Sequence, residues 1–412
     1  MSTYIELYRD ADYGDVVCTF RVEPASGVSL ETAVDAIAAE SSIGTWTDIS
    51  TMSDEILSRL KPYAFSVDKE TNIVKIGYPV ELFEPGNISQ LLSSVAGNIF
   101  GMKHVENLRL EDMLLPRKYV KSFPGPAFGV TEVRRMLDIK DRPIVGTIVK
   151  PKVGLNPTQW AQAAYDALSG GCDFVKDDEN LTSQEFCTFE DRASLALRMI
   201  KALETASGRK FGYGCNISAS AETMVKRAEF IRDNGGRYMM IDVVTVGFAG
   251  LQYLRSLNLG LAIHAHRAMH AALTRNKKHG ISMLVLAKLY RLAGVDQLHV
   301  GTAVGKMEGP AMEVQAIKNE MLSDRDDWRG LRRVFPVCSG GLHPGHVPEL
   351  MQLMGTDIVI QAGGGVYGHP ESPKAGAASM RQAVDAVMQN VSLEEYAKTH
   401  EELRKALDKF AK

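Results

Sequence analysis

The stretch Phe174-Val175-Lys176-Asp177-Asp178-Glu179-Asn180 is the point from which the fold can be worked out. Its apolar start is typical of a buried strand, and it ends abruptly in one amine followed by three carboxylates. Side chains alternate faces along a strand, so Lys176 and Asp178 are expected to point the same way, with Glu179 joining them as the chain leaves the strand. Such a group of oxygen ligands favours a hard divalent cation such as Mg²⁺.

A simpler interpretation of the same stretch is a solvated loop that caps the next helix, because Asp and Asn favour helix N-termini. That interpretation weakens because the pattern of an apolar strand followed by polar residues recurs along the chain. The runs expected to form strands are 144–149, 172–175, 211–217, 238–244, 261–264, 297–300, 334–338 and 357–361.

Helix-like stretches separate these runs, with apolar residues at three- and four-residue steps, as in Met224, Ala228 and Ile231. Alternating strands and helices build a parallel sheet, and eight such units close into a (βα)₈ barrel. An open doubly wound sheet is the alternative, but no Gly-x-Gly-x-x-Gly follows the first strand to support it. We therefore predict an α/β protein with a C-terminal (βα)₈ TIM barrel.

The first 120 residues follow a different pattern, with strands expected at 16–22 and 73–78 and helices at 30–40 and 88–99. A proline-containing segment at 115–126 is the expected linker. The prediction is an α+β N-terminal domain over 1–120, followed over 121–412 by the barrel domain with its C-terminal helices.

Composition excludes several classes of protein. A net charge of −3 over 412 residues argues against nucleic-acid binding. No apolar run reaches the length of about 18 residues that a membrane span needs, and the N-terminus lacks the pattern of a secretory signal. The five cysteines include no Cys-x-x-Cys pair, so a cytoplasmic setting is predicted.

Active sites of (βα)₈ barrels lie at the carboxyl ends of the strands. Here those ends carry basic, acidic, neutral polar and glycine residues: Lys150, Lys152, Lys176, Asp178, Glu179, Asn216, Asp242, His264, His266, Arg267, His299, Ser339, Gly341, Gly363, Gly364. Glycine clusters let backbone N–H groups approach an anion, and Arg supplies a forked donor for phosphate. Two phosphate sites on either side of a metal fit a sugar bisphosphate.

These residues resemble a known family, the large subunit of ribulose-1,5-bisphosphate carboxylase/oxygenase (RuBisCO). The resemblance extends over nearly the whole chain in family order. The matching blocks include Glu40-Ser41-Ser42-Ile43-Gly44-Thr45-Trp46, Gly97-Asn98-Ile99-Phe100-Gly101, Lys150-Pro151-Lys152, His264-Ala265-His266-Arg267 and His299-Val300-Gly301-Thr302-Ala303-Val304-Gly305-Lys306, besides the stretch quoted first.

The resemblance implies an Mg²⁺ site made by Lys176, carbamylated by activator CO₂, together with Asp178 and Glu179. It implies that the carbamate takes the C3 proton of ribulose 1,5-bisphosphate, with His266 assisting. CO₂ or O₂ then adds, Lys150 protonates the product carbanion, and Lys306 closes over the substrate to stabilise the new carboxylate.

It further implies two phosphate sites. Residues at the first would be Arg267, His299 and Ser339. Residues at the second would be Thr45, Trp46, Gly341, Gly363 and Gly364, with Lys152 also among the substrate-binding residues.

In the family, Glu40 and Asn98 reach the barrel site of a neighbouring subunit, Glu40 pairing with Lys306. The resemblance therefore implies a homodimer or a higher assembly of dimers. Where the plant-type enzyme has threonine two positions before the first catalytic lysine, this chain has Ile148. That difference favours the archaeal-type (form III) group.

Two other functions stay open on the residues alone. RuBisCO-like proteins keep the fold but replace several catalytic residues and act as enolases or isomerases on methylthio-sugar phosphates. A sugar-phosphate-binding scaffold protein would need the glycines but not the lysine and metal set.

Overall fold

The computed structural model describes residues 4–45, 47, 49–304, 311–325, 328 and 330–411. By its contacts the chain divides into two compact units. The first comprises Met1–Gly125, Met269–Ala293 and Asp324–Leu331, and the second comprises Pro126–Ala268, Gly294–Ser323 and Arg332–Lys412. The predicted division of domains at residue 120 stays a prediction.

The first unit is built on a five-stranded sheet in the order β10-β4-β1-β3-β2. β1 pairs antiparallel with both β3 and β4, whereas the short β10 runs parallel to β4. The strands are β1 (Val16–Pro24), β2 (Tyr63–Asp68), β3 (Ile73–Tyr78), β4 (Val105–Leu114) and β10 (Gly280–Ile281). The helices of this unit are α1 (Leu30–Glu40), α2 (Asp54–Leu60), α3 (Ile88–Val95), α4 (Arg117–Val120), α10 (His270–Thr274) and α11 (Met283–Ala293), with short 3₁₀ turns η1 (Val80–Leu82) and η2 (Asn98–Gly101).

Local sequence explains where α1 begins and which face it buries. The Ser29 hydroxyl accepts a hydrogen bond from the Thr32 amide and caps the helix. Ala33, Val34 and Ile37 then recur at the three- and four-residue steps that place them on one buried face. This places Glu40, the last residue of α1, at the helix end.

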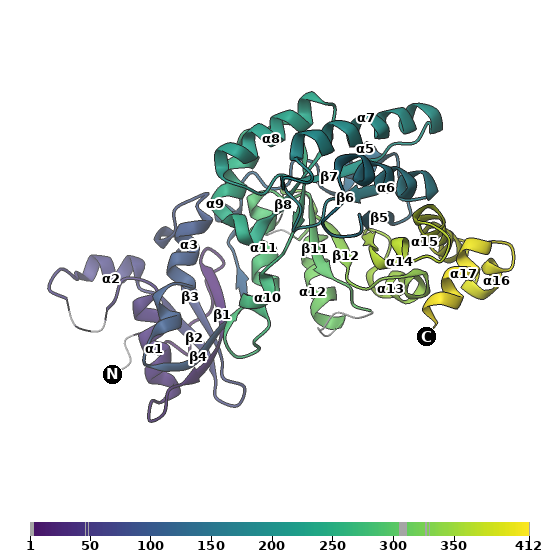
Figure 1. The fold of residues 1–412 in the computed structure, drawn as a ribbon. Helices are drawn as coiled ribbons and strands as arrows, with labels where there is room; N and C mark the ends of the chain where they lie inside the picture. Colours follow the sequence, from purple (N-terminus) through teal and green to yellow (C-terminus); the bar gives the residue numbers. More distant parts are fainter. Residues whose placement is uncertain are drawn as a thin grey trace. The chain divides into compact units, whose positions relative to one another are not determined.

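The second unit is a closed eight-stranded parallel barrel in the order β11-β12-β13-β5-β6-β7-β8-β9 (Figure 1). The strands are β5 (Ile144–Ile148), β6 (Phe174–Lys176), β7 (Gly212–Asn216), β8 (Tyr238–Asp242), β9 (Ala262–His266), β11 (Gln297–Gly301), β12 (Phe335–Ser339) and β13 (Val359–Gln361). Each of the eight predicted runs contains or overlaps one of these strands, so the predicted fold class is confirmed.

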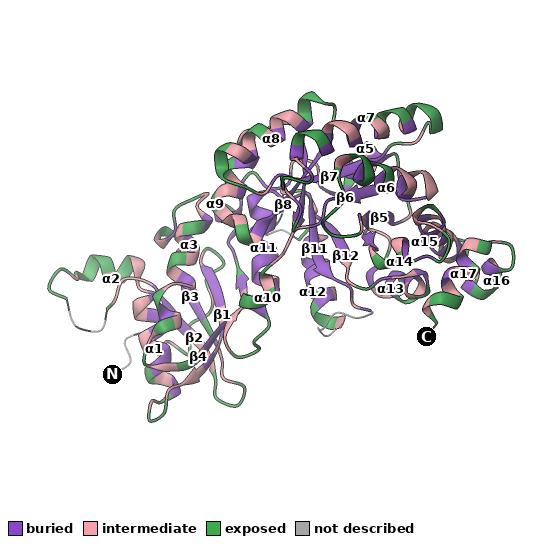
Figure 2. Cartoon of the chain, in the orientation of Figure 1, coloured by how far each residue is buried: buried purple, intermediate pink, exposed green. Residues whose placement is uncertain are grey.

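Helices surround the barrel strands and expose their outer faces. Figure 2 shows buried strands inside helices that alternate between buried and exposed residues. These helices are α5 (Gly129–Leu137), α6 (Pro157–Gly170), α7 (Phe189–Ser207), α8 (Ala221–Asp233), α9 (Val243–Ser256), α12 (Ala311–Met321), α13 (Val347–Met354), α14 (Gly364–Tyr367), α15 (Pro373–Met388), α16 (Leu393–Ala397) and α17 (Glu401–Phe410), with the 3₁₀ turn η4 (Pro344–His346).

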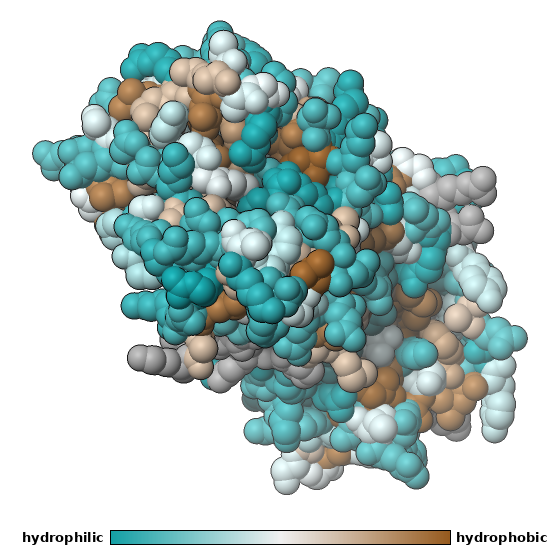
Figure 3. Space-filling model, turned by 90° about the vertical axis from the view of Figure 1, so that its right-hand side faces the viewer, coloured by the Kyte–Doolittle hydropathy of each residue, from teal (hydrophilic) through white to brown (hydrophobic). Residues whose placement is uncertain are grey.

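A core cluster closes the amino-terminal part of the barrel, where Ile144, Phe174, Tyr238, Ala262 and Phe335 are fully buried. On the one molecular face in Figure 3, hydrophilic residues predominate and hydrophobic ones form small groups. Within the described residues, no helix has the length and apolar character needed to cross a membrane.

One helix end of the N-terminal prediction was wrong. The helix predicted at 88–99 stops at Val95 and is followed by η2, and a Cβ at Gly97 would lie 2.0 Å from the Ser93 carbonyl oxygen, so the turn between the two elements requires glycine. The linker predicted at 115–126 contains the short helix α4.

Candidate active site

Lys176 is the last residue of β6 and is fully buried. Its Nζ donates a hydrogen bond to the Asp177 carbonyl oxygen at 2.8 Å and lies 3.7 Å from Glu179 Oε2. Burial lowers the pKa of Lys176 below that of an ordinary lysine, although the charges of Glu179, Asp178 and Asp242 oppose this shift. An amine with a lowered pKa is uncharged more often, and the uncharged form is the nucleophile.

The Glu179 carboxylate lies close to three basic side chains, those of Lys176, Lys152 and His266. Its Oε1 lies 3.7 Å from Lys152 Nζ, and its Oε2 lies 3.6 Å from His266 Nε2. Burial alone would raise the pKa of Glu179, but His266, Lys176 and Lys152 outweigh it and lower the pKa to about 2. Glu179 is therefore ionised throughout the neutral pH range and is an anionic oxygen donor.

Asp178 forms the second carboxylate of the site. Lys150 Nζ donates to Asp178 Oδ2 at 2.9 Å, and the Asp178 side chain is almost completely buried. This pair joins the end of β5 to the turn after β6. A cation bound at Asp178 would displace Lys150 from its present partner, because the two positive charges would compete for the same oxygen.

His266 lies between two carboxylates. Its Nδ1 is 3.0 Å from Asp242 Oδ1, on the opposite side of the ring from Glu179. The Ala268 amide nitrogen also lies 3.3 Å from Nδ1, so Nδ1 is held between Asp242 and the backbone while Nε2 faces Glu179. The neighbouring Asn216 Nδ2 donates to Asp242 Oδ2 at 3.4 Å and to the Glu179 carbonyl at 3.3 Å. The ends of β7, β8 and β9 thus fix the orientation of this imidazole.

A buried ion pair holds the turn that carries the two acids. Arg192, on α7, makes two parallel hydrogen bonds to Asp177, with both N–O distances at 3.1 Å. Neither side chain is exposed. The Asp177 carboxylate also accepts hydrogen bonds from Tyr213 Oη at 3.0 Å and from the backbone amide of Asn216 at 2.8 Å. Arg192 also donates to the carbonyls of Thr182 and Cys187, so one side chain organises the whole β6–α7 loop.

The first predicted phosphate site contains a buried hydrogen-bonded chain. Gln297 Oε1 lies 2.7 Å from His264 Nδ1, the Nε2 atoms of His264 and His299 are 3.0 Å apart, and His299 Nδ1 lies 2.7 Å from Ser339 Oγ. Burial lowers the pKa of His264 to about 3 and that of His299 well below its usual range, so both rings are neutral. With Gln297 as acceptor, each ring has one proton to donate, and Ser339 donates to His299.

Arg267 supplies the positive charge beside this chain. Burial lowers its pKa to about 10, which still leaves the guanidinium protonated near neutral pH. Among the residues that the structure describes, no carboxylate pairs with Arg267. A protonated guanidinium without a carboxylate favours an incoming anion.

The second predicted phosphate site is lined by glycines. Gly340 and Gly341 adopt φ values of 126° and 72°, which side-chain-bearing residues rarely adopt. A Cβ on Gly363 would lie 3.0 Å from Lys150 Cε, so a side chain there would press on the end of the lysine. Gly363 directly precedes α14, which begins at Gly364.

The predicted residues of the N-terminal region lie in the first unit. Asn98 Nδ2 lies 3.5 Å from Glu40 Oε1, so the structure brings these two together, and Thr45 is exposed. Trp46 and Lys306 fall outside the described residues. Sequence reasoning missed Arg192, Tyr213 and Gln297 as parts of the site, because nothing in the local pattern links them to residues far along the chain.

A closed parallel barrel with a buried lysine among carboxylates at its strand ends is typical of (βα)₈-barrel enzymes. The family of the ribulose bisphosphate carboxylase large chain matches in two parts, its N-terminal domain over residues 3–119 and its catalytic domain over residues 129–410. The chain belongs to the ribulose bisphosphate carboxylase (RuBisCO) large-chain family.

Related proteins and solved structures match this chain over nearly its whole length. The ribulose bisphosphate carboxylase of Methanosarcina barkeri is 48% identical, covering 98% of this chain and 99% of that protein. That of Pyrococcus furiosus is 50% identical, with 97% and 96% covered. The octameric Rubisco of Pyrococcus horikoshii, solved as a complex with sulfate ion, superposes with a TM-score of 0.95 at 47% identity, covering 99% and 96% of the chains.

The dimeric archaeal Rubisco of Hyperthermus butylicus superposes with a TM-score of 0.93 at 44% identity, covering 99% of this chain and 98% of that one. These matches confirm the predicted likeness to the archaeal-type group. The alternative of a RuBisCO-like enolase or isomerase is not favoured, because these relatives are named as carboxylases.

Proposed function

We propose that this chain is a ribulose-1,5-bisphosphate carboxylase/oxygenase that forms 3-phosphoglycerate at the carboxyl end of its barrel. The observation that carries the proposal is Lys176, a buried amine with a lowered pKa that faces Glu179 and neighbours Asp178. The catalytic domain is proposed to span 121–412, and the N-terminal domain 1–120.

The residues present fit an Mg²⁺ site once Lys176 is carbamylated. Among the described residues, no group of three or more His, Cys, Asp or Glu side chains is arranged to hold a metal ion. A carbamate on Lys176 would add the missing oxygen donor to Asp178 and Glu179, and a neutral amine is the form that captures CO₂. When bound, Mg²⁺ would stabilise the negative charge that develops on the sugar as its C3 proton is removed.

The surrounding side chains are assigned the proton transfers. The Lys176 position accepts the C3 proton, and His266, held by Asp242, assists at the same carbon. The electron pair released at C3 forms the new bond from C2 to CO₂, or to O₂ in the oxygenase reaction. In the carboxylase reaction, C3 becomes a carbonyl carbon as the bond to CO₂ forms, water then adds at C3, the C2–C3 bond breaks with its electron pair left on C2, and Lys150 returns a proton to that carbon. In the oxygenase reaction the electron pair of the C2–C3 bond goes to the departing peroxide oxygen, and C2 becomes a carboxylate carbon without this protonation.

The two phosphate groups are assigned to opposite sides of this centre. Arg267, His299 and Ser339 bind one, and Gly341, Gly363 and Gly364 bind the other together with Thr45 and Trp46. Lys152 adds positive charge near the sugar, and Lys306 closes over it. Glu40 and Asn98 are assigned to the site of a neighbouring subunit in a homodimer.

The test is fixation of labelled CO₂ onto ribulose 1,5-bisphosphate by the whole protein, with and without Mg²⁺. We expect labelled 3-phosphoglycerate only with Mg²⁺, two product molecules forming per CO₂ fixed. Conversion of the sugar bisphosphate to an isomer without incorporation of label would instead identify an enolase or isomerase.

A further inference from the structure

A charged cavity lies in the barrel unit, away from the carboxyl ends of the strands. It has a volume of about 350 Å³. Arg142 lies just before β5, Asp173 just before β6, and Arg209 and Lys210 just before β7. The cavity therefore opens at the amino-terminal ends of three neighbouring strands, the end of the barrel opposite the proposed catalytic residues.

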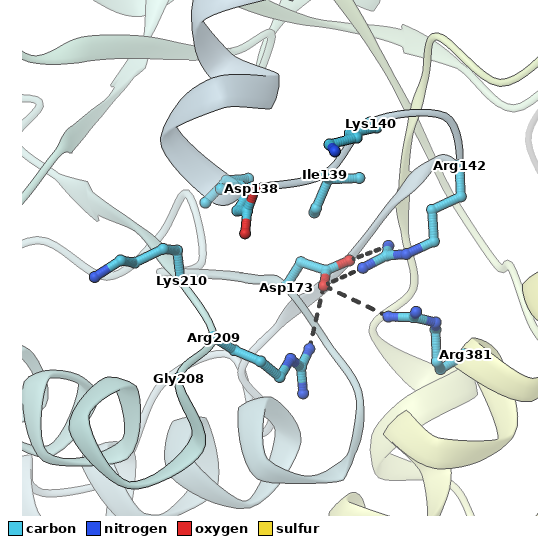
Figure 4. Close-up of a pocket in the computed structure, with 10 residues that line it drawn as sticks. Asp138, Ile139, Lys140, Arg142, Asp173, Gly208, Arg209, Lys210 and Arg381 are labelled. Atoms are coloured by element: carbon cyan, nitrogen blue, oxygen red, sulfur yellow. Dashed lines mark hydrogen bonds and ion pairs between the residues drawn. The ribbon is translucent and has the colours of Figure 1, made fainter.

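Three arginines in this cavity converge on one buried carboxylate, Asp173 (Figure 4). Arg142 binds it through two nitrogens at 2.6 and 2.8 Å, Arg209 Nη2 lies at 3.2 Å, and Arg381 Nη1 at 3.8 Å. The Val145 amide also donates to it at 3.0 Å. One negative charge thus faces three positive charges, and its hydrogen-bonding capacity is already filled.

Donors remain for another anion. Arg209 uses only Nη2, toward the Cys172 carbonyl and Asp173, so within the described part of the chain its Nε and Nη1 have no recorded acceptor. Arg209 is partly exposed, at 37% of its side chain. Lys140 and Lys210 are exposed at the rim. Two further carboxylates reduce this positive charge without cancelling it, since Asp138 lines the cavity and Asp385 binds Arg381 Nε at 2.9 Å.

The lining also contains apolar surface. Leu137 and Ile139 line the cavity, but both pack into the barrel core and only 2% and 6% of them is exposed, so this apolar part of the lining is small. A volume of this size lies at the lower end of sites that hold small organic ligands, and it exceeds what a lone oxyanion needs. Guanidinium groups bind phosphate through paired hydrogen bonds.

We propose that this cavity binds a small organic phosphate monoester, with Arg209, Arg381 and the rim lysines holding the phosphate and the remaining cavity volume holding the carbon part. The site goes beyond the proposed catalytic function and does not depend on it. The cavity lies at the amino-terminal ends of β5, β6 and β7. The opposite ends of these strands lead to Lys150, Lys176 and Asn216.

Equilibrium dialysis of the whole protein with labelled inorganic phosphate and with labelled glucose 6-phosphate tests the proposal. The number of binding sites per chain is measured for the wild type and for the pocket variant Arg209→Gln/Lys210→Gln. It is also measured for Arg267→Gln, which weakens phosphate binding at the proposed catalytic site. Arg198→Gln/Lys201→Gln, two exposed residues on α7, is the control with the same change of charge.

The pocket variant is expected to lose one site per chain for both ligands, or to bind there roughly tenfold or more weakly, because charged hydrogen bonds are removed. Arg267→Gln and the control keep that site. CO₂ fixation without added phosphate is unchanged in the pocket variant. Lys140→Gln/Lys210→Gln, which leaves all contacts of Asp173 in place, is expected to weaken the same site and guards against misfolding of the first variant.

Unchanged numbers and affinities in both pocket variants overturn the proposal. Binding of inorganic phosphate without glucose 6-phosphate overturns the assignment of an organic ligand. Because dialysis is done without turnover, failure here leaves the carboxylase assignment untouched, and failure of CO₂ fixation leaves this site untouched.

Discussion

Lys176 combines burial with four nearby carboxylates, and these two influences act in opposite directions on its amine. Desolvation prevails and lowers the pKa, whereas Glu179 beside it is held as an anion by His266, Lys176 and Lys152. At this residue scale the site therefore pairs a nucleophilic amine with an anionic oxygen ligand. Neither property can be deduced from the order of residues, because the first depends on burial and the second on charged side chains that only the fold brings together.

The pH dependence of activation follows from these two groups. CO₂ reacts with the unprotonated amine, so the rate of activation at constant dissolved CO₂ is expected to rise with pH and to level off above the pKa of Lys176. That plateau is expected below the ordinary lysine value of about 10.4. Glu179, with a pKa of about 2, adds no inflection in the neutral range. A rate that falls as pH rises would contradict this account.

Lys306 is predicted to act after CO₂ has added, because its partner, the new carboxylate, does not exist before that step. Lys306→Ala should still exchange the C3 proton of ribulose bisphosphate with solvent while fixing little CO₂. The two activities are measured on one sample by solvent-isotope exchange and by labelled CO₂. Equal loss of both would place Lys306 in ground-state binding instead.

At the scale of elements, the eight barrel strands could be predicted because each is an apolar run that ends in polar residues. The strands β2 and β4 of the first unit escaped prediction. β4 carries Glu106, Arg109 and Glu111, and Arg109 is buried through hydrogen bonds to backbone carbonyls, so its charge hides the apolar alternation. Asp177 and Arg192 are far enough apart in sequence that only the folded β6–α7 loop brings them together.

That loop allows a prediction about stability. Removing one partner from a buried ion pair leaves an unpaired charge, so Arg192→Met is expected to lower the free energy of unfolding by about 3–5 kcal/mol. Asp177→Asn alone leaves the buried Arg192 without its carboxylate partner and is expected to lower the free energy of unfolding by a similar amount. The double variant is expected to lose much less than the sum of the two, as measured by denaturant unfolding.

Arg198→Met, an exposed change on the same helix, is the control and should stay within about 0.5 kcal/mol of the wild type. Mg²⁺ binding by the double variant should also weaken, because the turn carrying Asp178 and Glu179 loses its support. Strictly additive losses of stability would show that the two side chains do not act as a pair.

At the scale of the whole molecule, Glu40 and Asn98 lie together in the first unit, and their assignment to a neighbour's site rests on family resemblance. Two inactive variants, Glu40→Gln and Lys176→Arg, should therefore regain activity when mixed and reassembled. In a heterodimer one site carries both changes and the other neither, so about half of wild-type activity per heterodimer is the upper limit. Persistent inactivity despite demonstrated subunit exchange would mean that each site is built within one chain.

The central claim is that the buried amine of Lys176 becomes a carbamate that, with Asp178 and Glu179, forms the metal site. ¹³C NMR of the whole protein with ¹³C-bicarbonate and Mg²⁺ tests it directly. We predict one carbamate signal per chain in the wild type and in Lys152→Arg, lost in Lys176→Arg and weakened when Mg²⁺ is withheld. An unchanged signal in Lys176→Arg, or no signal in the wild type while it fixes CO₂, would contradict the account.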